Sequence, residues 1–442
     1  MLYGAAAESH LRRLDVLQNA CLRLVLGARN TTPIISMQVE SHVPPLSLRR
    51  GYLLVRQLLT LRYRPHLDCT VQLLQLNSSL LGRAYPFHLF ASRAVFWMQS
   101  LDIYIRRVPE ALPRLFPPAL LHPYISIDCC PMVVDDVTFN AYRASTFSGY
   151  HYYYSDGSRI VEHQGFSTGA AVYDPQKGSA TCWRLPPDLS VLGAELYGIL
   201  GALKQIATTL APAVVFTGFI CGTAKCCPAV VSEIWHLLVT LNASRPVCLH
   251  WIRAHIGIRG NEIADLAASR AHANDRVELH PLSCRESVAV LWKAFYSYWE
   301  DYWHGTSELT QTGQFLLTIR SHISQEQPLI NLYSRRAEIV LYHLRMGHAG
   351  VMTYLYRFNM SDGAQCPHSG CADEESIEHM FLQCPAHAVQ RQALQSALSR
   401  LSISTLSVRL LLGADPAYVL HRLDILQLTV SFLQDIGRLA TL

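Results

Sequence analysis

Three acidic residues and one histidine have side chains that could take part in metal-assisted chemistry. Asp156 follows an aromatic run, and Glu195 lies within a largely apolar helical segment. The string H-x-G-x-x-G-N-E-x-A-D at 255–265 begins with His255 and ends with Asp265. Clustered carboxylates are the ligands that Mg²⁺ prefers, and two such ions together can drive hydrolysis. If the fold brings these carboxylates together, they could hold divalent metal ions for hydrolytic chemistry.

Each residue also has an ordinary structural interpretation when it is taken alone. The pair Asp156-Gly157 is typical of a hairpin or turn. Glu195 alone is typical of a solvated helix position. Asp265 alone is typical of an acid near a helix N-terminus, where the helix dipole favours it. The functional interpretation depends on finding all three in order.

The elements that would position these side chains alternate between strands and helices. Three short apolar or aromatic runs joined by turns predict an antiparallel meander, and the segments after it alternate between helix and strand. The expected order is βββαβαβα. The expected elements are strands at 151–155, 165–173 and 179–185, a helix at 190–209, a strand at 214–217, a helix at 227–241, a strand at 247–252 and a helix from 263.

This order, with acids at these places, resembles a type 1 ribonuclease H. The strings that carry the resemblance are SDGS at 155–158, AEL at 194–196 and the string at 255–265. The resemblance covers residues 150–275. It implies an α/β fold with a ribonuclease H-like mixed five-stranded sheet and helices, flanked by helical N- and C-terminal regions.

The resemblance also implies an activity, the cleavage of the RNA strand of an RNA–DNA hybrid with two Mg²⁺ ions. Asp156 would then bridge the metals, Glu195 would order one, Asp265 would hold the second, and His255 would lie on a mobile loop that helps product leave. Gly257, Gly260 and Asn261 would shape the turn before the last helix. No small-molecule cofactor is expected.

A fourth acidic ligand of the family is missing. The family's fourth strand ends in Thr-Asp-Ser, whereas this chain reads Thr217-Gly218-Phe219. Gly218 has no side chain to coordinate a metal. Loss of one ligand should weaken metal binding and misplace the attacking water, so we expect activity to be impaired.

The flanking regions resemble non-LTR retrotransposon polyproteins of the arthropod type. Residues 11–50 are similar to the tract that follows the reverse transcriptase there, and Tyr-x-Asp-Asp, the polymerase motif, is absent. The chain is thus interpreted as the 3′-terminal fragment of such an element. The expected domains are a helical tract at 1–109, a Pro-rich linker at 110–147 that includes a solvated pair Asp135-Asp136, a ribonuclease H-like domain at 148–282 and a helical region at 288–442.

The C-terminal region carries a Cys/His motif. Cys366, Cys371, His379 and Cys384 are spaced C-x4-C-x7-H-x4-C, and three thiolates with one imidazole suit a tetrahedral structural Zn²⁺. The family more often has two residues between the first two cysteines. The alternative is buried or idle thiols. We assign no function to Cys129-Cys130 or Cys226-Cys227, and interpret His343 and His348 as helix-face or phosphate-contacting groups.

Charge favours nucleic acid as the partner. Arginine outnumbers lysine 33 to 4, and residues 1–130 hold 14 arginines, no lysine and 7 acids. Arginine binds phosphate with a planar fork, although a bias in the source genome would produce the same excess. Apolar residues make up 50% of the chain and charged residues 16%, which excludes a disordered tail, a collagen or a coiled coil.

The sequence predicts no signal peptide and no transmembrane segment, hence no membrane partner and an intracellular protein, cytoplasmic or nuclear. Two function classes remain open. The first is an RNA–DNA hybrid ribonuclease. The second is a catalytically inactive module that binds RNA or hybrid, or the product of a decayed element. Gly218 is the feature that separates them.

Overall fold

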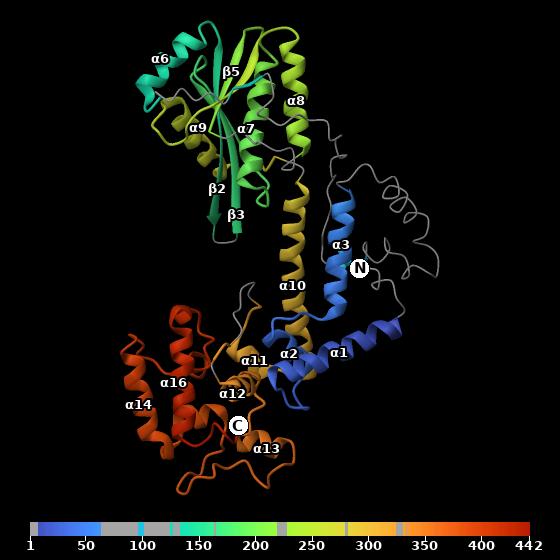
Figure 1. The fold of residues 1–442 in the computed structure, drawn as a ribbon, viewed down its shortest axis with the longest axis vertical. Coiled ribbons are helices and arrows are strands. Elements are labelled where there is room, and N and C mark those ends of the chain that lie inside the picture. Colours follow the sequence, from blue (N-terminus) through green and yellow to red (C-terminus); the bar gives the residue numbers. More distant parts are fainter. Residues whose placement is uncertain are drawn as a thin grey trace. The chain divides into compact units, whose positions relative to one another are not determined.

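The computed structural model describes residues 8–62, 96–100, 124–126, 133–162, 165–218, 228–278, 282–323, 330–332 and 334–442. The chain divides into two compact units (Figure 1). The central unit runs from residue 54 to 293, and the terminal unit combines the chain up to residue 53 with the chain from 294 onwards.

The helices and strands follow the chain in this order: α1 (Glu8–Leu26), α2 (Ile34–Glu40), α3 (Leu46–Arg62), β1 (Ile125–Ser126), α6 (Asp136–Thr146), β2 (His151–Glu162), β3 (Gly165–Asp174), β4 (Ser179–Leu185), α7 (Val191–Ile206), β5 (Ala213–Thr217), α8 (Pro228–Asn242), β6 (Val247–Trp251), α9 (Arg259–Arg270), η4 (Ala271–Ala273), α10 (Cys284–Thr310), α11 (Gln314–Ile319), α12 (Arg335–Met346), α13 (Met352–Arg357), η5 (His379–Gln383), η6 (Pro385–His387), α14 (Ala388–Ser399), α15 (Val408–Leu411), η7 (Pro416–His421) and α16 (Arg422–Asp435).

The central unit is built on one mixed sheet with strand order β1-β6-β5-β2-β3-β4. β2, β3 and β4 form the predicted antiparallel meander, and β5 and β6 run parallel to β2. The expected mixed sheet of five strands with helices is confirmed, and the two-residue strand β1 adds a sixth at the edge beyond β6.

Helices cover both faces of this sheet (Figure 1). Tyr153 and Val215 pack with residues of α7 and α8, whereas their neighbours Tyr154 and Phe216 pack with Phe139 of α6 and Ala264 of α9. Successive residues of a strand point to opposite faces, so a strand that is apolar at consecutive positions must be covered twice. The sheet therefore brings α7 and α9 to opposite sides of β2.

β2 is longer than the sequence predicts. The expected strand ended at Ser155, with Asp156-Gly157 as a turn, but β2 continues to Glu162. Its pairing with β3 runs unbroken through Asp156 opposite Ala171 and Gly157 opposite Ala170. The turn interpretation of Asp156-Gly157 is thus wrong, because cross-strand pairing with β3 overrides the local turn preference. Asp156 lies in the middle of a strand.

Helix α6 lies in the segment expected to be a linker with little regular structure. Asp135 begins it with a capping box, in which its carboxylate accepts from the Thr138 backbone N–H at 2.8 Å. Phe139, 1% exposed, anchors the helix in the core. The interpretation of Asp135-Asp136 as a merely solvated pair is wrong, since Asp136 Oδ1 accepts from the backbone N–H of Arg259, the first residue of α9, at 2.8 Å.

The terminal unit has a core made from both ends of the chain. Leu22 and Leu26 of α1 and Met37 of α2 share one cluster with apolar residues of α12, α14 and α16. His343 of α12, predicted to be a helix-face or phosphate-contacting group, is buried instead. Its ring nitrogens lie 2.8 Å from the Gly27 carbonyl oxygen and 3.1 Å from that of Leu442. His343 therefore links the first helix to the last residue.

A buried ion pair joins the same two regions. Arg345 Nε lies 2.9 Å from Glu40 Oε1, and both side chains are 2% exposed. Arg320 Nη1 lies 4.0 Å from the other carboxylate oxygen and donates to the Val39 carbonyl at 2.7 Å. A buried charge requires a partner, so the end of α2 is held against the C-terminal segment.

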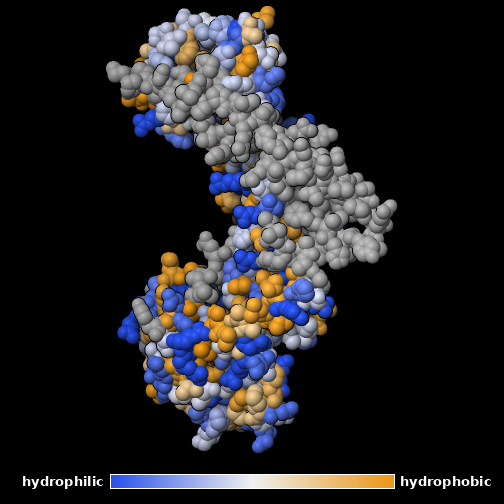
Figure 2. Space-filling model, turned by 45° about the vertical axis from the view of Figure 1, so that its right-hand side comes forward, coloured by the Kyte–Doolittle hydropathy of each residue, from blue (hydrophilic) through white to orange (hydrophobic). Residues whose placement is uncertain are grey.

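The surface of the terminal unit mixes polar and apolar residues (Figure 2). On α1, Val16, Leu17 and Leu24 are each more than half exposed, while Leu22 and Leu26 are buried. Among the described helices, none is both long and apolar enough to cross a lipid bilayer. Cys129-Cys130 and Cys226-Cys227 lie outside the described residues.

We expect Glu40→Gln to loosen the terminal unit. The substitution keeps the shape of the side chain but leaves Arg345 buried without its counter-charge, which typically costs about 3 kcal/mol. Backbone amides of α12 should then exchange hydrogen about 100-fold faster in exchange mass spectrometry. The matched variant Glu308→Gln, at an exposed position of α10, should leave that exchange unchanged. Equal protection of α12 in both variants would contradict the structural role of the pair.

Candidate active site

The three predicted carboxylates come from one strand and from helices on its two sides. Asp156 lies on β2, Glu195 on α7 and Asp265 on α9. Asp265 raises the pKa of Asp156, and both raise the pKa of Glu195, so the three carboxyls lie within electrostatic reach of one another. The structure thus brings together residues that are 109 positions apart from first to last, with Asp156 as the central member.

Two glycines allow α7 to approach β2 closely enough for this. A Cβ at Gly157 would lie 2.4 Å from the backbone nitrogen of Glu195, and one at Gly198 would lie 3.1 Å from the Asp156 carbonyl oxygen. Real side chains do not tolerate the first distance, so the residue after Asp156 must be glycine here. The D-G pair is therefore explained by helix–strand contact.

Burial sets the electrostatics of the cluster. The pKa of Glu195 is raised to about 9, first by burial and then by the charges of Asp156 and Asp265. The pKa of Asp156 is raised to about 7, first by burial and then by the charge of Asp265, and the charge of His255 opposes the rise. Glu195 Oε2 is buried and has no hydrogen-bond partner among the described residues. Closely placed carboxylates repel one another, and one of their oxygens has no hydrogen-bond donor. A hard divalent cation would supply the positive charge that such a cluster needs.

His255 stands on the loop between β6 and α9. It is exposed and has a positive φ of 58°, which is uncommon for a residue other than glycine. Its effect on the pKa of Asp156 shows that it lies within electrostatic reach of the cluster.

Gly218 lies where the resemblance expects the fourth acid. Thr217, the last residue of β5, pairs with Ser155, so position 218 comes beside Asp156 in the parallel register. The Gly218 carbonyl accepts from the Trp251 indole N–H at 3.0 Å. A Cβ at this position would lie 3.2 Å from Ala254 Cβ. Position 218 is therefore next to the cluster but contributes no ligand, and a side chain there would press on Ala254.

Two acids with no functional role predicted from the sequence hold the helices of the site. Glu286 Oε1 accepts from the backbone N–H of Ser190 at 2.7 Å, at the start of α7, while Asp136 caps α9. Negative charge at a helix N-terminus is favourable. The string Ser283-x-x-Glu286 is a capping-box signature, so the sequence did contain a signal for Glu286.

The Cys/His motif of the terminal unit converges as the sequence predicts. One ligand atom from each of Cys366, Cys371, His379 and Cys384 lies within 4.8 Å of all the others. Cys366 Sγ is 3.8 Å from Cys384 Sγ, and Cys371 Sγ is 3.4 Å from His379 Nε2. Tetrahedral coordination at Zn–S distances of about 2.3 Å requires sulfur atoms about 3.8 Å apart. The four side chains are thus spaced as zinc ligands.

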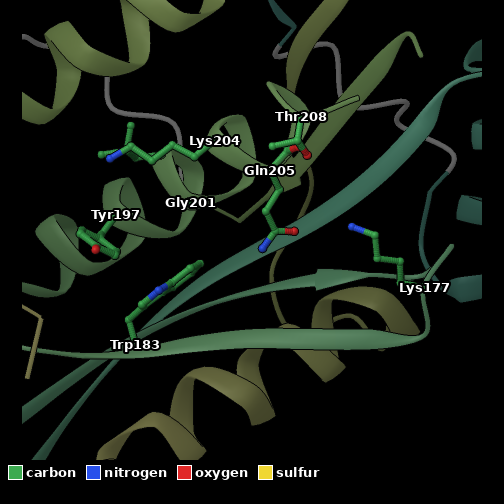
Figure 3. A pocket seen from close by; sticks show the side chains of 8 residues that line it. Lys177, Trp183, Tyr197, Gly201, Lys204, Gln205 and Thr208 are labelled. Atoms are coloured by element: carbon green, nitrogen blue, oxygen red, sulfur yellow. The ribbon is translucent and has the colours of Figure 1, made fainter. Parts of the chain in front are cut away.

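A separate cavity of about 290 Å³ lies beside α7 (Figure 3). Trp183 and Tyr197 line it, together with Lys177 and Lys204, and no member of the carboxylate cluster does. Lys177 pairs with Asp174 at 3.4 Å and Lys204 with Glu233 at 2.8 Å. Both cations are already neutralised, so the cavity adds nothing to the candidate active site.

Comparison with known proteins gives structural neighbours only. No protein-family model matches the chain, and no curated protein matches it. Among solved structures, the ribonuclease H domain of prototype foamy virus aligns at 15% identity and TM-score 0.23, over 28% of this chain and 94% of that one. LC11 ribonuclease H1 in complex with an RNA/DNA hybrid aligns at 12% identity and TM-score 0.21, over 27% and 97%.

The N-terminal ribonuclease H domain of rv2228c from Mycobacterium tuberculosis, in a fusion with maltose-binding protein, aligns at 14% identity and TM-score 0.20, over 28% and 94%. At such values the fold assignment depends on the topology itself. The antiparallel meander β2–β3–β4, the parallel strands β5 and β6 beside β2, and helices on both faces define the central unit as ribonuclease H-like.

We expect Glu195→Gln to stabilise the metal-free central unit more at pH 8 than at pH 5. A carboxyl whose pKa is raised on folding keeps its proton in the folded chain at pH values where the same carboxyl has lost it in the unfolded chain. The free energy of unfolding therefore falls as pH rises from about 4 to the raised pKa of Glu195. The amide removes this penalty, by more than about 1 kcal/mol at pH 8.

The measurement is urea unfolding in the presence of a chelator. Unfolding is monitored by the protease protection of peptides from residues 133–278. The exposed Asp275→Asn should show no such pH dependence. A gain for Glu195→Gln that is the same at both pH values would mean that this carboxyl is not perturbed.

Proposed function

We propose that this chain is a ribonuclease that hydrolyses the RNA strand of RNA–DNA hybrids, with an activity that Gly218 reduces. The observation that carries the proposal is the convergence of half-buried Asp156, Glu195 and Asp265 within electrostatic reach of one another, with Glu195 Oε2 buried and without a hydrogen-bond partner among the described residues. A core of this kind is costly unless a cation completes it.

The site fits divalent metal ions, because its donors are carboxylate oxygens only. Mg²⁺, when bound, would supply an activated water and neutralise charge on the leaving oxygen. Asp156 would hold both ions, Glu195 one of them and Asp265 the other. The rigid β2 and the two capped helices keep these carboxylates in place before substrate arrives, and exposed His255 can contact the product phosphate and release it.

Gly218 supports the second function class, a hybrid- or RNA-binding module without catalysis. Position 218 adjoins Asp156, so the missing carboxylate lies on the side of the site that β5 covers. Binding would persist in such a module, because phosphate contacts do not depend on the metal ligands. Origin from a non-LTR retrotransposon, proposed from residues 11–50 and the Cys/His tail, is compatible with either class and with decay of the element.

We expect Gly218→Asp to raise hybrid cleavage at least about 10-fold, mainly in kcat, because the ligand acts on the reacting water and not on hybrid affinity. The new Cβ meets Ala254 Cβ at 3.2 Å, so the double variant Gly218→Asp with Ala254→Gly should gain more. The assay follows a labelled RNA–DNA hybrid with Mg²⁺ or Mn²⁺.

The matched control is Gly218→Ala, which adds the same Cβ without a carboxylate and should not gain activity. Asp156→Asn should abolish cleavage in every background. If the unaltered chain cleaves at the rate of Gly218→Asp, the fourth ligand is dispensable. If no variant cleaves while hybrid binding persists, the binding module is the function.

We also propose that Cys366, Cys371, His379 and Cys384 hold a structural Zn²⁺. Support comes from their mutual spacing and from the burial of Cys366, His379 and Cys384. His379 Nε2 lies 3.4 Å from Cys371 Sγ, and the opposite ring nitrogen, Nδ1, lies 3.9 Å from exposed Asp373 Oδ2.

Zinc analysis of the purified full chain tests this assignment. We expect zinc to survive gentle purification, and Cys371→Ser to lose it and to become sensitive to protease within residues 352–399, because structural zinc contributes folding energy. The control Cys21→Ser changes an exposed free cysteine of α1 and should keep its zinc. Equal zinc contents in the two variants would refute the site.

A further inference from the structure

Two histidines beside Cys384 are not used by the proposed zinc site. His368, Cys384 and His387 form a second group, in which one ligand atom of each residue lies within 4.8 Å of the others. Cys384 belongs to both groups. The two imidazoles therefore lie beside a sulfur that also belongs to the first candidate metal position.

His387 is packed closely against His368. Its side chain is 4% exposed. Its ring packs edge-on against His368 at 4.7 Å and against Phe432 at 6.4 Å between centroids. Imidazole is a common ligand of Zn²⁺, so a metal ion is a partner that two such closely placed histidines can share.

The backbone holds both histidines close to the sulfur. His387 follows Cys384 by three residues, at the end of the single-turn helix η6, and its N–H donates to the Cys384 carbonyl at 3.2 Å. His368 lies in the loop between Cys366 and Cys371, which closes through the Cys371 N–H to the His368 carbonyl at 3.1 Å. The residues that lengthen this loop beyond a two-residue spacing thus supply the second group with a ligand.

Charge favours a second cation at this place. Three thiolates and one neutral imidazole around a divalent ion leave a net charge of about −1, and a thiolate in such a set can bridge to a second metal. Nitrogen with sulfur donors selects a borderline cation such as Zn²⁺ over Mg²⁺ or Ca²⁺. His368 is half-buried, so the second position is open toward solvent on its side.

We propose that His368, His387 and a bridging Cys384 thiolate form a second, three-ligand site for a Zn²⁺-class cation beside the proposed structural zinc. The fourth coordination position is open. This inference rests on the proposed zinc site and is independent of ribonuclease activity.

The test is a Co²⁺ titration of the reduced, metal-free full chain. Thiolate-to-cobalt absorption arises only from Co²⁺ bound to cysteine, so ions at the carboxylates do not contribute to it. Native mass spectrometry counts the bound ions. We expect the absorption of the unaltered chain to change through two equivalents. His387→Ala and His368→Ala should each stop at one equivalent and hold one ion fewer, whereas His421→Ala, at a partly exposed position in the same unit, should behave as the unaltered chain.

The loop position of His368 makes its variant the safer one if the buried His387 is needed for folding. Absorption that stops at one equivalent in the unaltered chain would overturn the second site and leave the first intact. Two equivalents in both histidine variants would overturn it as well. Absence of any thiolate band would refute the proposed structural zinc together with the second site.

Discussion

The candidate chemistry depends on how closely α7 crosses β2. At Gly157 and Gly198 the helix and strand meet with no side chain between them, and a Cβ at Gly157 would collide with the backbone of Glu195. This contact places a helix carboxylate close to a strand carboxylate, with both side chains half-buried. Burial and mutual repulsion raise the pKa values of Asp156 and Glu195, so holding both carboxyls in their charged form here is unfavourable.

The same site depends on segments that lie outside the sheet. The start of α7 is held by Glu286 of α10, and the start of α9 is held by Asp136 of α6. In each case an acid from a flanking helix satisfies backbone N–H groups that the helix itself leaves unpaired. A ribonuclease H-like unit cut at residues 148 and 282 would lose both acids. The boundaries that matter for the site are therefore wider than those of the sheet.

Much of this arrangement could be predicted from residue order. The alternation of strands and helices, the mixed sheet and the convergence of the Cys/His motif all follow from local patterns and spacing. The length of β2 could not be predicted, because Asp156-Gly157 has a strong local turn preference that only pairing with β3 overrides. The capping role of Asp136 also could not, since its partner Arg259 is 123 residues away. Likewise, the sequence does not predict that His387 is a candidate ligand, because this depends on the loop that places His368 beside it.

The terminal unit takes its core from α1 and α2 at one end of the chain and from α12, α14 and α16 at the other, with Glu40 paired to Arg345 across that gap in sequence. Contacts of such long range cannot form on the ribosome until the last helices emerge, whereas the strands and helices of the central unit are complete well before then. During synthesis, the apolar faces of α1 and α2 therefore remain uncovered until α12, α14 and α16 have been made. That interval makes them candidates for chaperone binding, and a chain that stops early would keep a ribonuclease H-like unit while leaving its first helices permanently unpaired.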